Sequence, residues 1–165
     1  MNESKWRRIA VGTRKRSMKV CDCAYLAGLV DADGCMSIQN QGRQIRLHIV
    51  MTDREVLEWV LKCTGVGILS ERDADPSKNK RKYFEWRCFS RNASEVTRAI
   101  SSFLIAKKLQ ATIILRYANF LANRTNPDAP ITKIEAEFGL ACSAQLKALN
   151  GKEQNRYSLN RAAPF

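Results

Sequence analysis

Histidine is nearly absent from this sequence, since the 165 residues contain only His48. A single histidine excludes metal sites built from several imidazole ligands and argues against a serine–histidine–aspartate triad. Long hydrophobic runs are absent as well. None approaches the ~18 residues of a membrane span, and the N-terminus lacks the apolar core of a secretory signal. We therefore expect an intracellular protein that is neither secreted nor inserted in a membrane.

Closely spaced cysteine pairs are also scarce. The six cysteines are scattered along the chain, and only Cys21 and Cys23 lie close together. No second pair or histidine cluster completes the spacing of a structural zinc site. The sequence therefore favours buried, reduced thiols, as is typical of intracellular proteins.

Acidic residues are outnumbered by basic ones. Lysine and arginine total 28 against 16 aspartates and glutamates, which gives a net charge of +12 and a pI near 9.8. A domain this basic usually binds a polyanion, most often nucleic acid. With 45% hydrophobic residues the chain can bury a core, and its length suits one domain.

The first 21 residues form a basic segment whose only acid is Glu3. Such an arm can contact DNA, keep the protein soluble, or serve as an organelle transit peptide, and the sequence leaves these alternatives open.

Residues 22–32, DCAYLAGLVDA, have the pattern of a helix with Asp22 as its N-cap. Ala24, Ala27, Gly28 and Asp31 share one helical face, and all but the last are small. Small residues allow two helix backbones to approach closely, so this face could receive another helix. The helix is expected to stop at residues 33–34, Asp-Gly.

A β-hairpin is expected over residues 36–51, with a turn at Gln41-Gly42. Its apolar and polar residues alternate, so one face of the hairpin is apolar and the other is polar. The polar face carries glutamine, arginine and histidine, which can read base edges in a DNA major groove. An ordinary solvated sheet face would look the same, and this segment alone does not separate the two interpretations.

The remaining pattern completes an α+β domain. A capping box formed by Thr52 and Glu55 predicts a helix through about Thr64, closed by glycine at positions 65 and 67. A second hairpin is expected from strands 68–73 and 82–89, followed by helices over 93–103, 105–123 and 131–149. The two hairpins predict a four-stranded antiparallel sheet backed by helices, in the order αββαββααα.

Residues 25–34, YLAGLVDADG, resemble the signature of the LAGLIDADG homing endonucleases almost letter for letter. The chain is most similar to the single-motif branch typified by algal chloroplast intron enzymes. That branch has a comparable Phe-Leu start with a following lysine, here residues 103–107, and a comparable Gln-x-x-Ala-Leu-Asn helix end, here 145–150. The resemblance covers an endonuclease domain over 22–156. The basic arm over 1–21 has no counterpart in the family, and a polar tail over 157–165 follows the domain.

The resemblance also implies a catalytic site. Asp33 and the backbone carbonyl of Ala32 would hold Mg²⁺, or Mn²⁺ or Ca²⁺ in its place, beside the scissile phosphate. Lys107 matches the family's active-site lysine, which would stabilise phosphate charge or poise the water. Asp53 stands where this branch usually has glutamine; it could organise water or bind metal, or be a helix first-turn acid. Asp31 is assigned to the helix interface or helix end.

One motif supplies the acids for one strand, and no second copy of it occurs in the chain. The resemblance therefore implies a homodimer whose small-residue faces meet across a two-fold axis, on a long, nearly palindromic double-stranded DNA site. No membrane partner or small-molecule substrate is expected. Candidate DNA-binding residues are Gln39, Gln41, Arg43, Gln44, Arg46, His48, Ser70, Arg72, Tyr83, Glu85, Arg87 and Lys152.

The implied function is a sequence-specific double-strand break that promotes intron mobility, in an organelle such as a chloroplast or mitochondrion, or in bacterial or phage cytoplasm. The alternative is an RNA maturase or a non-cleaving DNA-binding regulator on the same scaffold. The presence of both Asp33 and Lys107 argues against a fully degenerate site.

Overall fold

The computed structural model describes residues 7–14, 16–74, 81–124, 126 and 129–161, with side chains described up to residue 151. It confirms the α+β class. The elements in chain order are β1 (Arg7–Thr13), α1 (Val20–Asp33), β2 (Gly34–Gln39), β3 (Gln44–Met51), α2 (Arg54–Thr64), β4 (Val66–Arg72), β5 (Tyr83–Phe89), α3 (Ser90–Ile100), α4 (Lys108–Ala122) and α5 (Lys133–Arg161).

The sheet is fully antiparallel, in the order β1-β4-β5-β3-β2. It has five strands rather than the four expected, because the basic N-terminal segment supplies β1. The two predicted hairpins are confirmed as β2–β3 and β4–β5. Residues 7–13 were assigned to an arm on their basic composition, and their alternation is not clear because Ile9, Ala10 and Val11 follow one another. An irregularity in the pairing between Arg8 and Ala10 accounts for that pattern.

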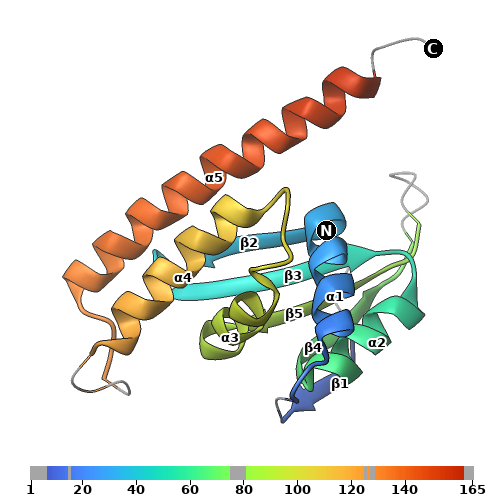
Figure 1. Ribbon diagram of the computed structural model, residues 1–165, viewed down its shortest axis with the longest axis horizontal. Coiled ribbons are helices and arrows are strands. Elements are labelled where there is room, and N and C mark those ends of the chain that lie inside the picture. Colours follow the sequence, from blue (N-terminus) through green and yellow to red (C-terminus); the bar gives the residue numbers. More distant parts are fainter. Residues whose placement is uncertain (1–6, 15, 75–80, 125, 127–128, 162–165) are drawn as a thin grey trace.

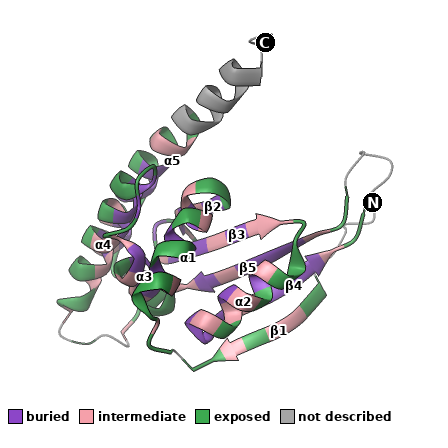
Figure 2. Cartoon of the chain, turned by 45° about the vertical axis from the view of Figure 1, so that its right-hand side comes forward, coloured by how far each residue is buried: buried purple, intermediate pink, exposed green. Residues whose placement is uncertain are grey.

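One face of the sheet forms the core. Leu47, Ile49 and Trp86 are completely buried and pack with apolar residues of the helices. The helices α1, α2, α3 and α4 lie on this side of the sheet (Figure 1). Buried residues are concentrated in β5, whereas β1 is largely exposed (Figure 2).

Two helix starts differ from the prediction by a few residues. The N-cap of α1 is Lys19, and Asp22 instead lies in the first turn, where its carboxylate accepts a hydrogen bond from the Lys19 backbone N–H at 3.3 Å. The N-cap of α2 is Asp53, one residue after the expected Thr52, and its carboxylate accepts from the Val56 N–H at 3.3 Å. Both acids favour the positive end of the helix dipole.

Helix α5 is longer than expected. It begins close to the predicted residue 131, at a capping box in which Thr132 and Glu135 exchange side-chain and backbone hydrogen bonds. However, it continues through Gly151 to Arg161, so the helical stop at residues 150–151 was wrong and part of the expected tail is helical. Among the described helices, none combines the length and hydrophobicity needed to cross a bilayer.

α5 runs beside the edge strand β2 (Figure 1). Ser143 donates a hydrogen bond to the Ile38 carbonyl at 3.0 Å, and Asn150 donates to the Met36 carbonyl at 3.4 Å. These side chains occupy carbonyl groups that an edge strand would otherwise present to another chain.

The β2–β3 turn makes a close backbone contact with α5. Gly42 adopts φ +81°, and a Cβ on Gly139 would overlap the Gly42 carbonyl oxygen. The same carbonyl accepts a 2.6 Å hydrogen bond from the buried Tyr117 hydroxyl of α4. Glycine at position 139 therefore lets three elements meet at one carbonyl group.

Replacement of this glycine tests the contact. We expect Gly139→Ala to lower the free energy of unfolding by about 1–3 kcal/mol, because the turn must move away from α5. Gly151→Ala is the matched control on the same helix, since its added Cβ would meet no atom within 4 Å. It should raise stability by up to about 1 kcal/mol through helix propensity. Urea denaturation followed by circular dichroism measures both; equal stability of the two variants would contradict the contact.

Candidate active site and nucleic-acid interface

Asp33 is the last residue of α1 and is exposed. Within the described part of the chain, its carboxylate makes no ion pair and no hydrogen bond. The next residue, Gly34, packs so closely against Val30 that a Cβ would come within 2.7 Å of the Val30 carbonyl oxygen. Glycine therefore lets the chain pass directly from α1 into β2, which leaves the acid before it at the surface.

Asp31 faces a different neighbour from Asp33. Its carboxylate accepts hydrogen bonds from the backbone N–H groups of Ile105, at 2.7 Å, and Lys107, at 2.8 Å. The carboxylate thus fixes the segment that precedes α4. This assigns Asp31 to the helix end, as expected, and shows what it holds there.

Lys107 returns a contact to the same residue. Its ammonium group donates a 2.6 Å hydrogen bond to the Asp31 backbone carbonyl, and the residue is only 6% exposed. A positive charge at the C-terminal end of a helix is favoured by the helix dipole. The predicted catalytic lysine is therefore held at the end of the helix that carries Asp33, because the Asp31 carbonyl that it contacts is only two residues before Asp33 in sequence.

Asp53 lies at the same end of the sheet. Residue 34 begins β2 and pairs with Ile49, and β3 ends at Met51, shortly before Asp53. The carboxylate is exposed and caps α2. Its structural role is therefore that of a helix cap, and its catalytic role stays a prediction.

The metal donors of one protomer are few. Among the described residues, no three histidine, cysteine, aspartate or glutamate side chains gather into a possible metal site. Asp33 offers a carboxylate, and Ala32 lies in the last helical turn, whose carbonyls lack intrahelical donors. Both are hard oxygen ligands of the type that Mg²⁺ takes together with phosphate and water. The donors therefore fit a divalent ion such as Mg²⁺ in kind, although they supply only part of its usual oxygen ligands.

The small-residue face of α1 is narrower than expected. Ala24 and Gly28 are exposed, and a Cβ on Gly28 would meet no atom within 4 Å. Ala27, by contrast, is fully buried in the core, so its assignment to an outward interface was wrong. Four residues at helical spacing span too wide an arc for all of them to point away from the sheet.

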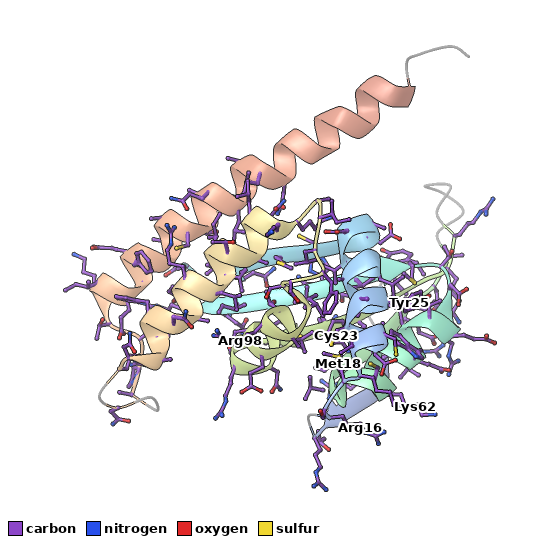
Figure 3. All side chains as sticks on the ribbon, in the orientation of Figure 1. Arg16, Met18, Cys23, Tyr25, Lys62 and Arg98 are labelled. Atoms are coloured by element: carbon purple, nitrogen blue, oxygen red, sulfur yellow. The ribbon has the colours of Figure 1, made fainter. Side chains whose placement is uncertain are left out.

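Two residues of α1, Tyr25 and Cys23, lie beside this face of the helix. The exposed Tyr25 contacts Trp59 of α2 edge to face, with ring centroids 4.9 Å apart. Cys23, two residues earlier, is buried. Tyr25 and Cys23 are both marked on α1 in Figure 3. All six cysteines are free thiols, but the expectation that they are buried was wrong in part: Cys23, Cys88 and Cys142 are buried, whereas Cys21 is exposed.

The predicted DNA-reading residues of the strands share one face of the sheet. Strand pairing places Gln39 beside Gln44, His48 beside Arg87, and Arg72 beside Tyr83. Arg46, Ser70 and Glu85 occupy the same face. This is the face opposite the core, and we call it the polar face. Gln41 and Arg43 are exposed in the β2–β3 turn, and the side chain of Lys152 lies outside the described residues.

Two of these residues cannot reach a ligand directly. Glu85 is 2% exposed and forms ion pairs with Arg46 and Arg87, which cover it. Ser70, its neighbour on β4, is also buried. The prediction of base contacts by Glu85 and Ser70 was therefore wrong for this arrangement; Glu85 positions two arginines instead.

His48 lies beside the same arginines. Burial, and then the positive charge of Arg46, lower its pKa from 6.5 to about 4 despite the nearby Glu85. The imidazole is therefore neutral near pH 7, with one nitrogen as donor and the other as acceptor. A neutral histidine can offer hydrogen bonds to a base edge without adding charge.

Unpaired polar atoms gather on the polar face. In the part of the chain that is described, the buried side-chain atoms without a hydrogen-bond partner are Ser37 Oγ, Arg46 Nε, His48 Nδ1 and Ser70 Oγ. Each such atom costs about 1–3 kcal/mol unless a partner is supplied. All four atoms lie on the polar face, so this face has hydrogen-bonding capacity that the described residues leave unused.

Sequence reasoning missed two polar residues here. Ser37 lies opposite Arg46 on the polar face, and Asn40 in the turn donates a 2.8 Å hydrogen bond to the Gln44 side chain. The alternation of β2 already placed Ser37 with Gln39, so its position could have been found. Asn40 adopts φ +51° in the turn and could not be placed from alternation alone.

The comparisons with known proteins agree with this geometry. Residues 21–109 match the family model described as a LAGLIDADG-like domain. Among curated protein sequences, none matches the chain.

Similar solved structures include the homing endonuclease I-CvuI bound to the I-CreI DNA target with magnesium, at 20% identity and TM-score 0.52, covering 77% of this chain and 95% of that one. The archaeal intron-encoded homing endonuclease I-Vdi141I bound to DNA matches at 21% identity and TM-score 0.58, covering 77% and 82%. At this identity the likeness shows a shared fold, and it confirms the predicted fold class.

The contacts of the two motif acids predict that substitution of Asp31 lowers stability and that substitution of Asp33 leaves it almost unchanged. We expect Asp31→Asn to lower the free energy of unfolding by about 1–3 kcal/mol, because an amide offers one acceptor oxygen to the two N–H groups. Asp33→Asn is the matched control, and it should change stability by less than about 0.5 kcal/mol because its carboxylate has no partner among the described residues. Urea unfolding measures both. A stability loss for Asp33→Asn alone would contradict the assigned contacts.

Proposed function

This chain belongs to the family of LAGLIDADG-like domains, and from that membership we propose that it is a homing endonuclease. It acts as a homodimer that binds a long, nearly palindromic DNA site and cleaves both strands with divalent metal ions. The solved relatives are homing endonucleases bound to DNA, which supports this assignment. The observation that carries the proposal is the polar face with its unpaired buried atoms, together with an exposed Asp33 at the end of α1 that has no partner among the described residues.

The polar face supplies DNA recognition. Arginine can bind guanine through two parallel hydrogen bonds, and a neutral histidine can donate or accept at a base edge. Arg46 and Arg87 are already oriented by Glu85, so their side chains lose less freedom on binding. The net charge of +12 supplies attraction to phosphates that does not depend on sequence. Oriented polar side chains thus recognise the bases, and the basic surface binds the phosphates.

The catalytic residues lie at the end of α1. Asp33 and the carbonyl of Ala32 hold Mg²⁺, with Mn²⁺ or Ca²⁺ as possible occupants. When bound, the ion supplies Lewis acidity toward the phosphate and its attacking water. Lys107 places a positive charge at the same helix end, where it stabilises negative charge that grows on the phosphate. Asp31 positions that lysine through its backbone N–H.

Dimer formation follows from the number of acids. One protomer brings a single exposed motif acid, whereas cleavage of two strands needs two. The exposed residues Ala24 and Gly28 allow a second α1 to approach closely, and a two-fold axis would then bring the two Asp33 residues together. The host DNA lies in an organelle or in bacterial or phage cytoplasm, and the break promotes intron mobility.

Removal of the metal ligand tests the reaction. We expect Asp33→Asn to reduce cleavage by about a thousandfold, since a catalytic ion contributes several kcal/mol to the barrier. The substrate is a plasmid carrying the joined exon sequence of the host gene. Nicking and linearisation are followed on gels with Mg²⁺ and with EDTA, and the binding affinity should change little.

Wild-type protein that binds this target tightly but never nicks it would contradict the endonuclease assignment. That outcome would favour the non-cleaving regulator or the RNA maturase. Glu137→Gln is a matched control, because Glu137 is an exposed acid on α5, away from α1, and its variant should cleave at the wild-type rate.

A larger side chain on α1 tests the dimer. We expect Gly28→Leu to shift the protein from dimer to monomer and to abolish double-strand cleavage. The open space around Gly28 means that the fold of the protomer is retained. Sedimentation equilibrium gives the mass. The matched control is Ala144→Leu on an exposed position of α5, which should remain dimeric. A monomeric wild type that still cuts both strands would refute the two-fold arrangement.

A further inference from the structure

We propose that β1 extends the DNA-binding surface beyond the two hairpins, and that Arg8 on this strand binds a DNA phosphate. The inference rests on the proposed function and adds a contact to it. The residue pattern of the hairpins did not indicate it, because the N-terminal segment was not expected to join the sheet.

β1 is firmly attached to the sheet. It pairs with β4 from Arg7 to Thr13, and the pairing is prolonged by hydrogen bonds of 3.0 Å from Arg14 N–H to the Gly65 carbonyl and from Arg16 N–H to the Thr64 carbonyl. The chain then places Met18 against the core, at the base of α1 (Figure 3). The strand therefore has a fixed position relative to the polar face.

Two successive arginines on β1 point to opposite faces of the sheet, since side chains alternate along a strand. Arg7 pairs with Glu71 on the core side, where it forms an ion pair that Lys82 shares. The hydrogen bonds of Lys82 and Arg7 hold the pKa of Glu71 below its ordinary value. Arg7 is thus engaged within the protein.

Arg8 pairs with Ser70, and Ser70 in turn pairs with Glu85, so Arg8 continues a row of the polar face onto β1. Arg8 is exposed, and within the described residues it makes no ion pair and no hydrogen bond. Ser70 beside it is one of the residues with an unpaired buried atom. The row therefore ends in an arginine to which the described part of the protein offers no acceptor.

The dimensions of DNA indicate which group meets Arg8. Neighbouring strands lie about 4.8 Å apart, so a five-stranded sheet is about 19 Å across. The major groove is only about 12 Å wide. If the inner strands occupy the groove, an outer strand such as β1 lies over its wall, where the sugar–phosphate backbone runs. A guanidinium group there matches phosphate geometry.

The test compares full-length wild type with Arg8→Ala. The affinity for a duplex carrying the joined exon sequence is measured by fluorescence anisotropy in Ca²⁺ over a series of NaCl concentrations. We expect Arg8→Ala to weaken binding similarly on altered target sequences. The slope of log affinity against log salt should fall by about 1 per protomer, or about 2 for a dimer. Arg8→Lys should restore most of the slope.

Arg98→Ala is the matched control for net charge. Arg98 lies on α3, on the helix-covered side of the sheet, and its slope should stay near that of wild type (Figure 3). Thermal unfolding confirms that each variant is folded. An unchanged slope for Arg8→Ala, in a wild type that binds and cuts, would overturn the role of β1 alone. A loss limited to one base pair would overturn the phosphate assignment. A wild type that neither binds nor cuts would overturn the proposed function as well.

Discussion

The reciprocal contact between Asp31 and the residues before α4 is the constraint on which the site depends. The carboxylate fixes the backbone of Ile105 and Lys107, while the Lys107 ammonium binds the Asp31 carbonyl. Two segments more than 70 residues apart in sequence are thereby locked at the end of one helix. These contacts occupy the Asp31 carboxylate and one N–H of the lysine ammonium, and they leave Asp33 exposed. Within one motif, one acid therefore builds the site and the other remains available for chemistry.

The sequence motif indicated which residues belong to this site, but it did not indicate the contacts that hold them in place. Residues 25–34 identified the family because the motif demands small residues, two acids and a closing glycine at fixed positions. The separation of roles between Asp31 and Asp33 required the position of Lys107, which depends on how α4 packs. Likewise, alternation placed Arg46 and His48 on one face, but only strand pairing showed that Glu85 lies between arginines rather than toward a ligand. Alternation along a strand predicts which face of the sheet a side chain occupies, whereas contacts between strands far apart in sequence decide which side chains remain free to bind a ligand.

The ends of the chain escaped prediction for related reasons. β1 has β-branched residues at 9, 11 and 13, but its pairing with β4 is irregular between Arg8 and Ala10, so its own alternation did not predict a strand in the sheet. At the other end, residues 150–151, Asn-Gly, normally favour a helix stop. Asn150 instead binds the edge of β2 through its side chain, and the backbone continues as α5. In both cases a tertiary contact with a sheet edge outweighs local propensity.

The polar face shows how stability and recognition oppose each other. A face designed only for stability would not bury Ser37 and His48 atoms without partners, each of which costs about 1–3 kcal/mol. A ligand whose base edges supply those hydrogen-bond partners recovers this free energy on binding. A ligand whose base edges do not match leaves the atoms unpaired and binds more weakly, so the unpaired atoms favour one sequence over another. The Glu85 ion pairs act in the opposite sense, because they hold Arg46 and Arg87 in place before binding. The face thus combines atoms that need hydrogen-bond partners with arginines that are already oriented to bind a ligand. The neutral His48 can hydrogen-bond a ligand without adding a positive charge next to these arginines.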